Sequence, residues 1–203
     1  MWYVVDADEN AELIIGFSKD CSRDEYMDAL DDNKVEELLQ HVPVKKGDVF
    51  FIPAGLVHAI GKGVVVAEIQ QSSDVTYRIY DYKRVDDNGN ERELHTDQAL
   101  DVINFDASEN PKTAYTITPN EITPLVSCDY FTTNLIQFDT ALIRNYGQLD
   151  TFIAYMCIEG SFIIEANNEK TVVNKGDTVL IPACIDEVGL TPHDKVTLLE
   201  VHV

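Results

Sequence analysis

The chain has 203 residues, of which 45% are hydrophobic and 25% are charged. This is the composition of a folded globular protein, and it argues against extensive disorder. The formal net charge of −21 repels polyanions, which argues against nucleic acid or an anionic membrane surface as a partner. A phosphorylated substrate would therefore need its own local cluster of Arg and Lys in this protein.

The four cysteines are scattered along the chain, and none forms a Cys-x-x-Cys pair. No apolar signal stretch follows Met1, and no apolar run is long enough to span a bilayer. These features predict a cytoplasmic protein whose cysteines are small buried side chains or unreactive thiols.

The first half of the chain alternates short apolar runs with turn residues. The runs predict strands at 2–5, 13–15, 49–52, 64–66 and 76–80. The segment 86–90 contains Asn-Gly, which predicts a tight hairpin turn. Helices are expected in two places: after the capping-box sequence Ser22–Glu25, with Val35, Leu38 and Leu39 continuing the first, and after Thr96.

The second half begins after a change in composition. Residues 106–124 are rich in Asn, Pro, Thr and Ser without periodicity, which predicts a connection. Further strands are expected at 132–138, 151–158, 161–165, 179–181 and 196–201. Many short, closely spaced strands favour a sandwich or barrel. We therefore expect a mainly β protein with one module at 1–105, a connection at 106–124 and a second module at 125–203.

An internal repeat supports the two-module prediction. The sequence KGDVFFIPA at 46–54 recurs as KGDTVLIPA at 175–183, an offset of 175 − 46 = 129, with six of nine positions identical. Gly-Asp makes a turn into a strand, and Pro ends the strand because it donates no ladder hydrogen bond. The repeat therefore predicts two tandem copies of one β module.

The repeat also singles out His58. A Pro-x-x-x-x-His sequence after a Gly-Asp turn is similar to the later metal-binding motif of the cupin fold, in which the histidine points into the barrel. We therefore expect two tandem cupin, or jelly-roll, modules, with His58 as a metal ligand in the first. A lone histidine is more often an ordinary polar residue, and this alternative stays open. The aligned position in the second copy is Glu187 (58 + 129 = 187), so the second module is expected to be structural.

Three longer blocks make the resemblance more specific. These are MWYVVDA at 1–7, FIPAGLVHAIG at 51–61 and EIQQSSDVTYRIYDY at 68–82, joined by LHTDQAL at 94–100. Together they closely resemble the short bacterial phosphomannose isomerases of the cupin superfamily. The resemblance runs through nearly the whole chain and is densest from 46 to 104.

This resemblance implies an aldose–ketose isomerase that interconverts mannose 6-phosphate and fructose 6-phosphate with one catalytic zinc. In that family the metal is held by a Gln and a His of a Gln-x-His-Pro segment, a Glu of a Lys-Thr-Glu segment, and a later His. Only the last ligand has a match here, at His58. The family's Lys-Thr-Glu immediately precedes Met-Trp-Tyr, so the other ligands are expected upstream of Met1. A catalytic zinc needs about three protein ligands, which leaves the activity of the 203-residue chain open.

The same resemblance assigns a catalytic role to Arg78. It matches the family's active-site arginine, whose guanidinium can stabilise an enediolate anion or hold the phosphate. The alternative is a structural bridge to Asp74 or Asp81. Lys62, Lys83 and Arg84 are candidates for a phosphate-binding cluster, and the alternative for each is an exposed loop charge.

We consider three candidate functions. The first is the isomerase, and the second is a non-catalytic cupin that binds a sugar phosphate. The third, an oxygenase, would need a His-x-His pair, which the sequence lacks. The expected partner is a small sugar phosphate, without nucleic acid or membrane. An exposed strand edge near residues 1–5 could also pair with another chain in a homodimer.

Overall fold

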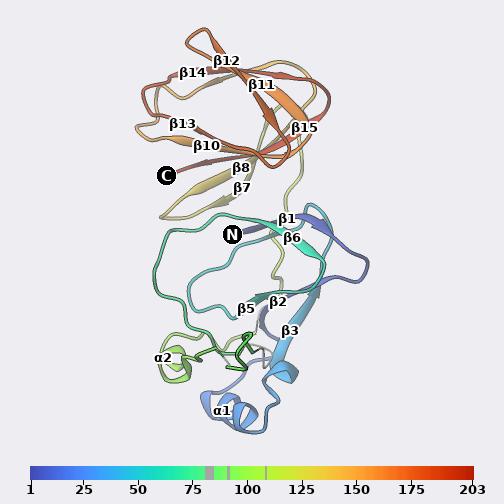
Figure 1. The fold of residues 1–203 in the computed structure, drawn as a ribbon, viewed down its shortest axis with the longest axis vertical. Coiled ribbons are helices and arrows are strands. Elements are labelled where there is room, and N and C mark those ends of the chain that lie inside the picture. Colours follow the sequence, from blue (N-terminus) through green and yellow to red (C-terminus); the bar gives the residue numbers. More distant parts are fainter. Residues whose placement is uncertain (81–84, 91, 108) are drawn as a thin grey trace. The chain divides into compact units, whose positions relative to one another are not determined.

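The computed structural model describes residues 1–80, 85–90, 92–107 and 109–203. The chain forms two compact units, Met1–Lys112 and Thr113–Val203, which we call the first and the second unit (Figure 1). The division falls inside the segment 106–124 that the sequence assigns to the connection. In both units the regular secondary structure of the described residues is mainly β-strand, as predicted.

The first unit contains two antiparallel sheets. One has the strand order β4 (Val49–Phe50), β1 (Trp2–Ala7), β6 (Val64–Glu68), and the other has the order β3 (Leu39–Pro43), β2 (Glu12–Phe17), β5 (His58–Ile60). Apolar side chains from both sheets pack in one buried cluster that contains Trp2, Val4, Leu13, Ile15, Val42 and Phe50. The space between these two sheets is therefore the interior of the first unit.

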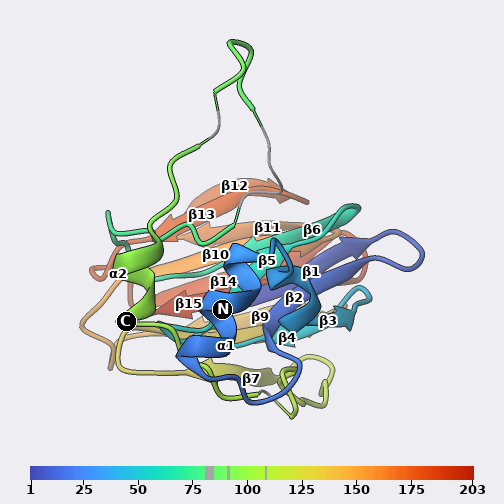
Figure 2. The same cartoon turned by 90° about the horizontal axis from the view of Figure 1, so that it is seen from below.

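The helices of the first unit cover the opposite face of the second sheet. They are α1 (Arg23–Asp31), the single 3₁₀ turn η1 (Val35–Leu38) and α2 (Thr96–Leu100). Ile14 and Phe17 of β2 pack against Tyr26 of α1 and Leu100 of α2, and both views show α1 over β2 (Figures 1 and 2). No helix in the described ranges is long and apolar enough to cross a membrane.

The predicted start of the first helix was correct, and its predicted continuation was wrong. Ser22 caps α1 in a complete capping box with Glu25, as the sequence predicts. The predicted continuation through Val35–Leu39 is wrong, because Asn33 adopts a positive φ of 58° that ends the helix. Thr96 is the first residue of α2 rather than its cap.

Two strand predictions for the first unit were also wrong. Residues 76–80 form no strand, and their hydrogen bonds go to the segment before α2 instead of a sheet. The predicted exposed edge near residues 1–5 does not exist either. Strand β1 is the central strand of its sheet, and Trp2 pairs with Phe50 on one side and Glu68 on the other. A homodimer cannot form through this strand while both neighbours are in place.

The second unit is a sandwich of two antiparallel sheets (Figure 1). One sheet has the order β13 (Thr178–Ile181), β10 (Ile153–Glu159), β15 (Val196–His202), β8 (Thr132–Phe138), β7 (Ile122–Ser127). The other has the order β12 (Glu169–Asn174), β11 (Ser161–Ala166), β14 (Glu187–Pro192), β9 (Leu142–Asn145). The core between them includes Phe138, Tyr155, Phe162, Leu190 and Leu198.

The repeated nonapeptide builds the same local structure in both units. Gly47 and Gly176 both have positive φ, at 92° and 91°. The carboxylates of Asp48 and Asp177 each accept a hydrogen bond from the backbone N–H three residues earlier, at 3.0 Å in the first unit and 2.8 Å in the second. A short strand follows each turn, as the sequence predicts.

The cysteines differ in their exposure, which gives a test of the fold. All four are free; Cys157 is buried and Cys184 is exposed. Burial is the main cause that raises the pKa of the Cys157 thiol to about 11. At neutral pH we expect a thiol-specific disulfide reagent to label Cys184 first and Cys157 only on unfolding. Mass spectrometry of the labelled peptides measures this order, and rapid labelling of Cys157 in the folded chain would contradict the burial.

Candidate functional site

His58 faces the interior of the first unit. It begins β5 and lies opposite Ile15 of β2, whose side chain belongs to the core between the two sheets. Residues paired across a sheet project from the same face, so His58 projects from that face as well. The side chain is nevertheless exposed, so solvent reaches the imidazole from one side.

The imidazole of His58 has a defined tautomer. Its Nδ1 lies 2.7 Å from the backbone oxygen of Leu56. A carbonyl oxygen only accepts hydrogen bonds, so Nδ1 donates, and in the neutral ring Nε2 then carries the lone pair. Histidines that bind metals commonly have this arrangement, with one ring nitrogen donating to a carbonyl and the other free to coordinate.

The residues around His58 do not complete a zinc site. In the described ranges no group of three or more His, Cys, Asp or Glu side chains could hold a metal ion. A catalytic zinc needs about three protein ligands, and His58 supplies one. The described part of the chain therefore offers one suitable imidazole and does not by itself fit the zinc that the resemblance implies.

Arg78 is held by the segment that precedes α2. Its backbone N–H donates to Nδ1 of His95 at 3.1 Å, and its backbone oxygen accepts from the N–H of His95 at 2.8 Å. One guanidinium nitrogen donates to the backbone oxygen of Glu93 at 3.2 Å. Among the described residues no ion pair joins Arg78 to Asp74, and Asp81 lies outside them.

The predicted phosphate-binding residues are only partly described. Lys62 is exposed in the turn between β5 and β6. Lys83 and Arg84 lie outside the described residues. The cationic cluster that a phosphate would require therefore stays a prediction.

Glu187, which the repeat aligns with His58, occupies a different environment. It begins β14, where the alternate residues Val188 and Leu190 point into the core of the second unit. Glu187 is exposed and points outward, because successive side chains on a strand point to opposite faces. No feature of Glu187 suggests a metal ligand.

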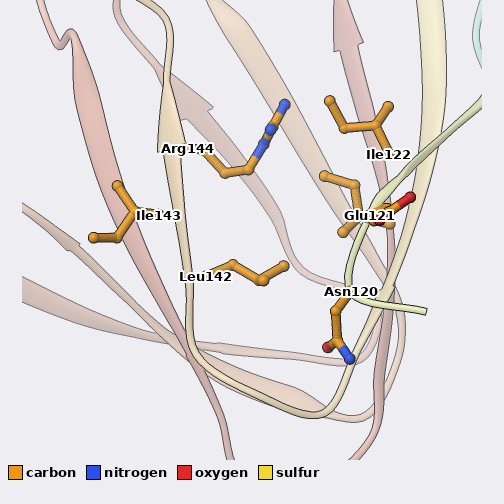
Figure 3. Close-up of a pocket in the computed structure, with 7 residues that line it drawn as sticks. Asn120, Glu121, Ile122, Leu142, Ile143 and Arg144 are labelled. Carbon is orange, nitrogen blue, oxygen red and sulfur yellow. The ribbon is translucent and has the colours of Figure 1, made fainter. Parts of the chain in front are cut away.

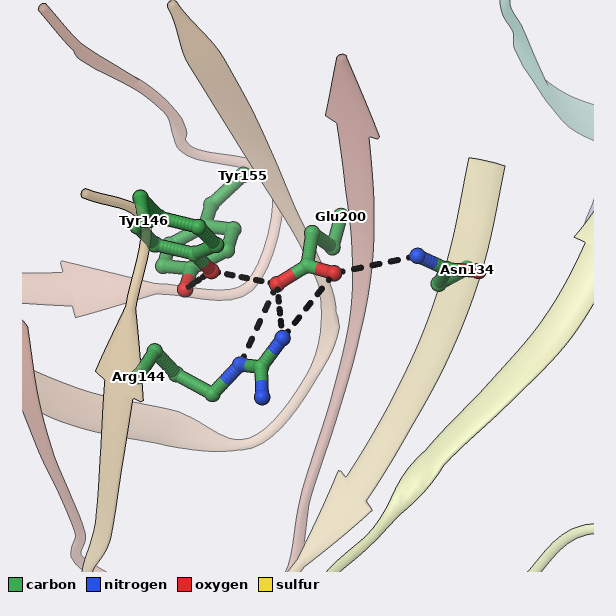
Figure 4. Close-up of polar contacts among 5 residues, drawn as sticks. All are labelled: Asn134, Arg144, Tyr146, Tyr155 and Glu200. Carbon is green, nitrogen blue, oxygen red and sulfur yellow. Dashed lines mark hydrogen bonds and ion pairs between the residues drawn. The ribbon is translucent and has the colours of Figure 1, made fainter. Parts of the chain in front are cut away.

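A buried polar network occupies the interior of the second unit instead (Figure 4). Glu200 is 2% exposed and accepts hydrogen bonds from Nε of Arg144 at 3.2 Å, from Nη2 of Arg144 at 3.0 Å and from Asn134 at 3.1 Å. The hydroxyl of Tyr146 also donates to Glu200 and contacts that of Tyr155. Burial, followed by the neighbouring ionisable groups, raises the pKa of both tyrosines.

A small cavity lies next to this network (Figure 3). Its volume is about 60 Å³, and Arg144, Leu142 and Ile122 are among its lining residues. Pockets that bind small molecules are typically about 300–1,000 Å³. The cavity is too small for a hexose phosphate and has room only for a few water molecules.

Two of these features were not predicted from the sequence. The first is Glu200 with its network, and the second is Trp2, whose ring contacts His58 with centroids 5.3 Å apart. The signal for Glu200 was present, since an acidic residue inside the apolar run 196–201 suggests a buried partner. Nothing in the sequence indicated that Trp2 would contact His58.

Comparison with known proteins shows which enzymes the chain resembles. Residues 121–203 match the family described as mannose-6-phosphate isomerase, cupin domain. The mannose-6-phosphate isomerase of Streptococcus mutans is 37% identical over 185 residues, which cover 91% of this chain and 58% of that protein. ManA, the mannose-6-phosphate isomerase of Bacillus subtilis, is 34% identical over 191 residues, which cover 93% of this chain and 60% of that protein. Residues 121–203 therefore match the cupin domain of this family, and the chain as a whole is similar to mannose-6-phosphate isomerases.

The fold supports this similarity. The crystal structure of the mannose 6-phosphate isomerase from Bacillus subtilis aligns with 100% of this chain and 63% of that chain, with a TM-score of 0.85 and 30% identity. The resemblance inferred from the sequence blocks is therefore confirmed. The chain spans 58% to 63% of the lengths of these three family members.

Proposed function

We propose that this chain acts in a zinc-dependent mannose-6-phosphate isomerase, which interconverts mannose 6-phosphate and fructose 6-phosphate. The observation that carries the proposal is the likeness to the Bacillus subtilis enzyme, which extends over 100% of this chain. The reaction moves a hydrogen between neighbouring carbons, so substrate and product have the same oxidation level overall. The proposed substrate class is a small sugar phosphate, and the proposed location is the cytoplasm.

The architecture we propose is a tandem pair of cupin modules at 1–105 and 125–203, joined by 106–124. The equivalent turns at Gly47 and Gly176 support it, as does the cupin-domain match of residues 121–203. In this scheme the first module carries the site. The second is structural, since its interior is filled by apolar side chains and the Glu200 network.

His58 and Arg78 carry the proposed chemistry. His58 contributes one zinc ligand through Nε2, and the remaining ligands come from the part of the family that this chain does not match. Removal of a proton next to the sugar carbonyl creates an enediolate, and the Arg78 guanidinium stabilises its negative charge or holds the phosphate. Lys62, Lys83 and Arg84 are the proposed phosphate-binding residues.

A second candidate function is favoured by one observation. The described residues offer no group of three His, Cys, Asp or Glu side chains for a metal. By itself the chain could therefore bind a sugar phosphate without turning it over. Such a protein would bind mannose 6-phosphate in calorimetry and release it unchanged.

The test compares the chain alone with the chain joined to the unmatched upstream part of the Bacillus subtilis relative. We expect the joined protein to hold about one zinc, as the single site of the family requires, and to interconvert the two hexose phosphates. His58→Ala should lower its activity by about 100-fold or more, because even partners that only orient a metal ligand contribute 10- to 100-fold. Metal analysis and a coupled assay for fructose 6-phosphate measure both.

The matched control is His41→Ala, which removes another exposed histidine of the first unit whose partner is Glu12. It should leave zinc content and rate unchanged. A joined His58→Ala protein that keeps both its zinc and its rate would show that the assignment of His58 is wrong. A joined protein that binds mannose 6-phosphate without isomerising it would favour the binding function.

A further inference from the structure

Trp2 packs directly against His58. The two ring centroids are 5.3 Å apart and the ring planes meet at 77°, which is an edge-to-face contact. Aromatic rings prefer this geometry because the positive edge of one meets the negative face of the other. Trp2 is 3% exposed whereas His58 is exposed, so a fixed buried ring adjoins a side chain that solvent could otherwise reorient.

Glu68 holds the indole of Trp2 in place. The indole Nε1 donates to the Glu68 carboxylate at 2.8 Å, and the two residues lie opposite each other in β1 and β6. A buried indole N–H needs an acceptor, and a carboxylate is a strong one. The orientation of Trp2 is therefore set by the core on one side and by Glu68 on the other.

The imidazole has one further fixed contact, the hydrogen bond from Nδ1 to the backbone oxygen of Leu56 at 2.7 Å. That bond selects the tautomer only while the ring stays in place, and an exposed ring that rotates about its side-chain bonds would break it. The Trp2 contact removes this freedom. Together the two contacts define both the proton position and the plane of the ring.

We propose that Trp2, oriented by Glu68, is a positioning residue for His58: it keeps the imidazole plane and the Nδ1–H tautomer fixed, so that Nε2 presents its lone pair in one direction. The inference rests on the proposed function only in assigning His58 to the site. The orientation of the ring is a property of the chain and is measurable without turnover. The proposed positioning role links His58 to Trp2 and Glu68, two residues that were not assigned to the site from the sequence.

The test is the tautomer of His58, read from the ¹⁵N–¹H correlation pattern of the imidazole, with His58→Ala to assign the signal. Spectra are recorded at about pH 8, where a model imidazole of pKa about 6.5 is neutral. The unsubstituted chain should show the Nδ1–H form. In Trp2→Leu the population of that form should fall to about half or less, since a neutral imidazole can carry its proton on either nitrogen.

Glu68 is exposed, and two substitutions at this position test whether its hydrogen bond to the indole matters. Glu68→Gln keeps an oxygen acceptor for the indole and should preserve the tautomer, whereas Glu68→Leu removes the acceptor and should shift it. This pair decides the question even if Trp2→Leu fails to fold. An unchanged tautomer in Glu68→Leu, with backbone amide signals of β1 and β6 intact, would overturn the positioning role.

The outcome is separable from that of the isomerase proposal. If the tautomer responds to Glu68→Leu while His58→Ala leaves the isomerase rate unchanged, the positioning is real and the functional assignment of His58 fails. If the tautomer does not respond but His58→Ala abolishes activity, the assignment stands and Trp2 has no positioning role.

Discussion

Replacing Arg144 with methionine should destabilise the second unit by about 3–5 kcal/mol, the usual cost of removing one partner of a buried ion pair. Glu200 would keep its hydrogen bonds from Asn134 and Tyr146 but lose the positive charge of Arg144 that pairs with it. The carboxylate is 2% exposed, so its charge would stay in the interior without the guanidinium that pairs with it. Urea unfolding followed by hydrogen exchange of the β10 and β15 amides measures the loss.

The matched control is the double variant Arg144→Met with Glu200→Met. A buried pair that is replaced as a whole by apolar side chains of similar size costs little, because no unpaired charge remains. We expect the double variant to recover only part of the stability that the single variant loses, because Asn134 and Tyr146 lose Glu200 as their acceptor. Equal losses in the two proteins would show that the contribution comes from other contacts of Arg144, such as that of its guanidinium carbon, which lies 5.5 Å from the centroid of the Tyr146 ring, instead of from charge pairing with Glu200.

The elements that sequence reasoning predicted well are those whose signal is local. The capping box at Ser22 needs only four consecutive residues, and β8 at Thr132–Phe138 is a continuous strand-forming run. The exposed strand β12 at Glu169–Asn174 was missed because only one of its residues, Val173, is buried. The run Thr76–Tyr80 misled for the opposite reason. It has strand-forming residues, but no neighbouring strand pairs with it in the described structure.

The site shows the same division between local and distant signals. His58 was found because its motif lies within a few residues of the Gly-Asp turn. Trp2 and Glu68, which we propose orient His58, were not predicted, because they are 66 residues apart in sequence. Likewise Arg144 and Glu200 are separated by 56 residues. Pairings of this kind depend on which strands become neighbours, and that is decided by packing of the whole unit.

Gly55→Ala should destabilise the first unit by about 2–5 kcal/mol, from two causes that act together. Gly55 has a φ of +85°, a conformation that costs an L-residue about 1–2 kcal/mol. A Cβ added there would lie 2.4 Å from the backbone oxygen of Val102, and such overpacking costs about 1–3 kcal/mol. The clash cannot be relieved by a side-chain rotation, because the obstructing atom is backbone. Unfolding monitored by the fluorescence of Trp2, the single tryptophan of the chain, reports on this unit.

Gly89→Ala separates the two causes. Gly89 has a similar φ of +83°, but no atom lies within 4 Å of the added Cβ. This variant should therefore show only the conformational cost of about 1–2 kcal/mol. The difference between the two variants is the contribution of the close approach between the Gly55 turn and the Val102 backbone. That turn leads directly into β5, so a loss confined to Gly55→Ala would tie the glycine to the placement of His58. Equal losses would mean that the turn can move away from Val102 and that the approach does not constrain the site.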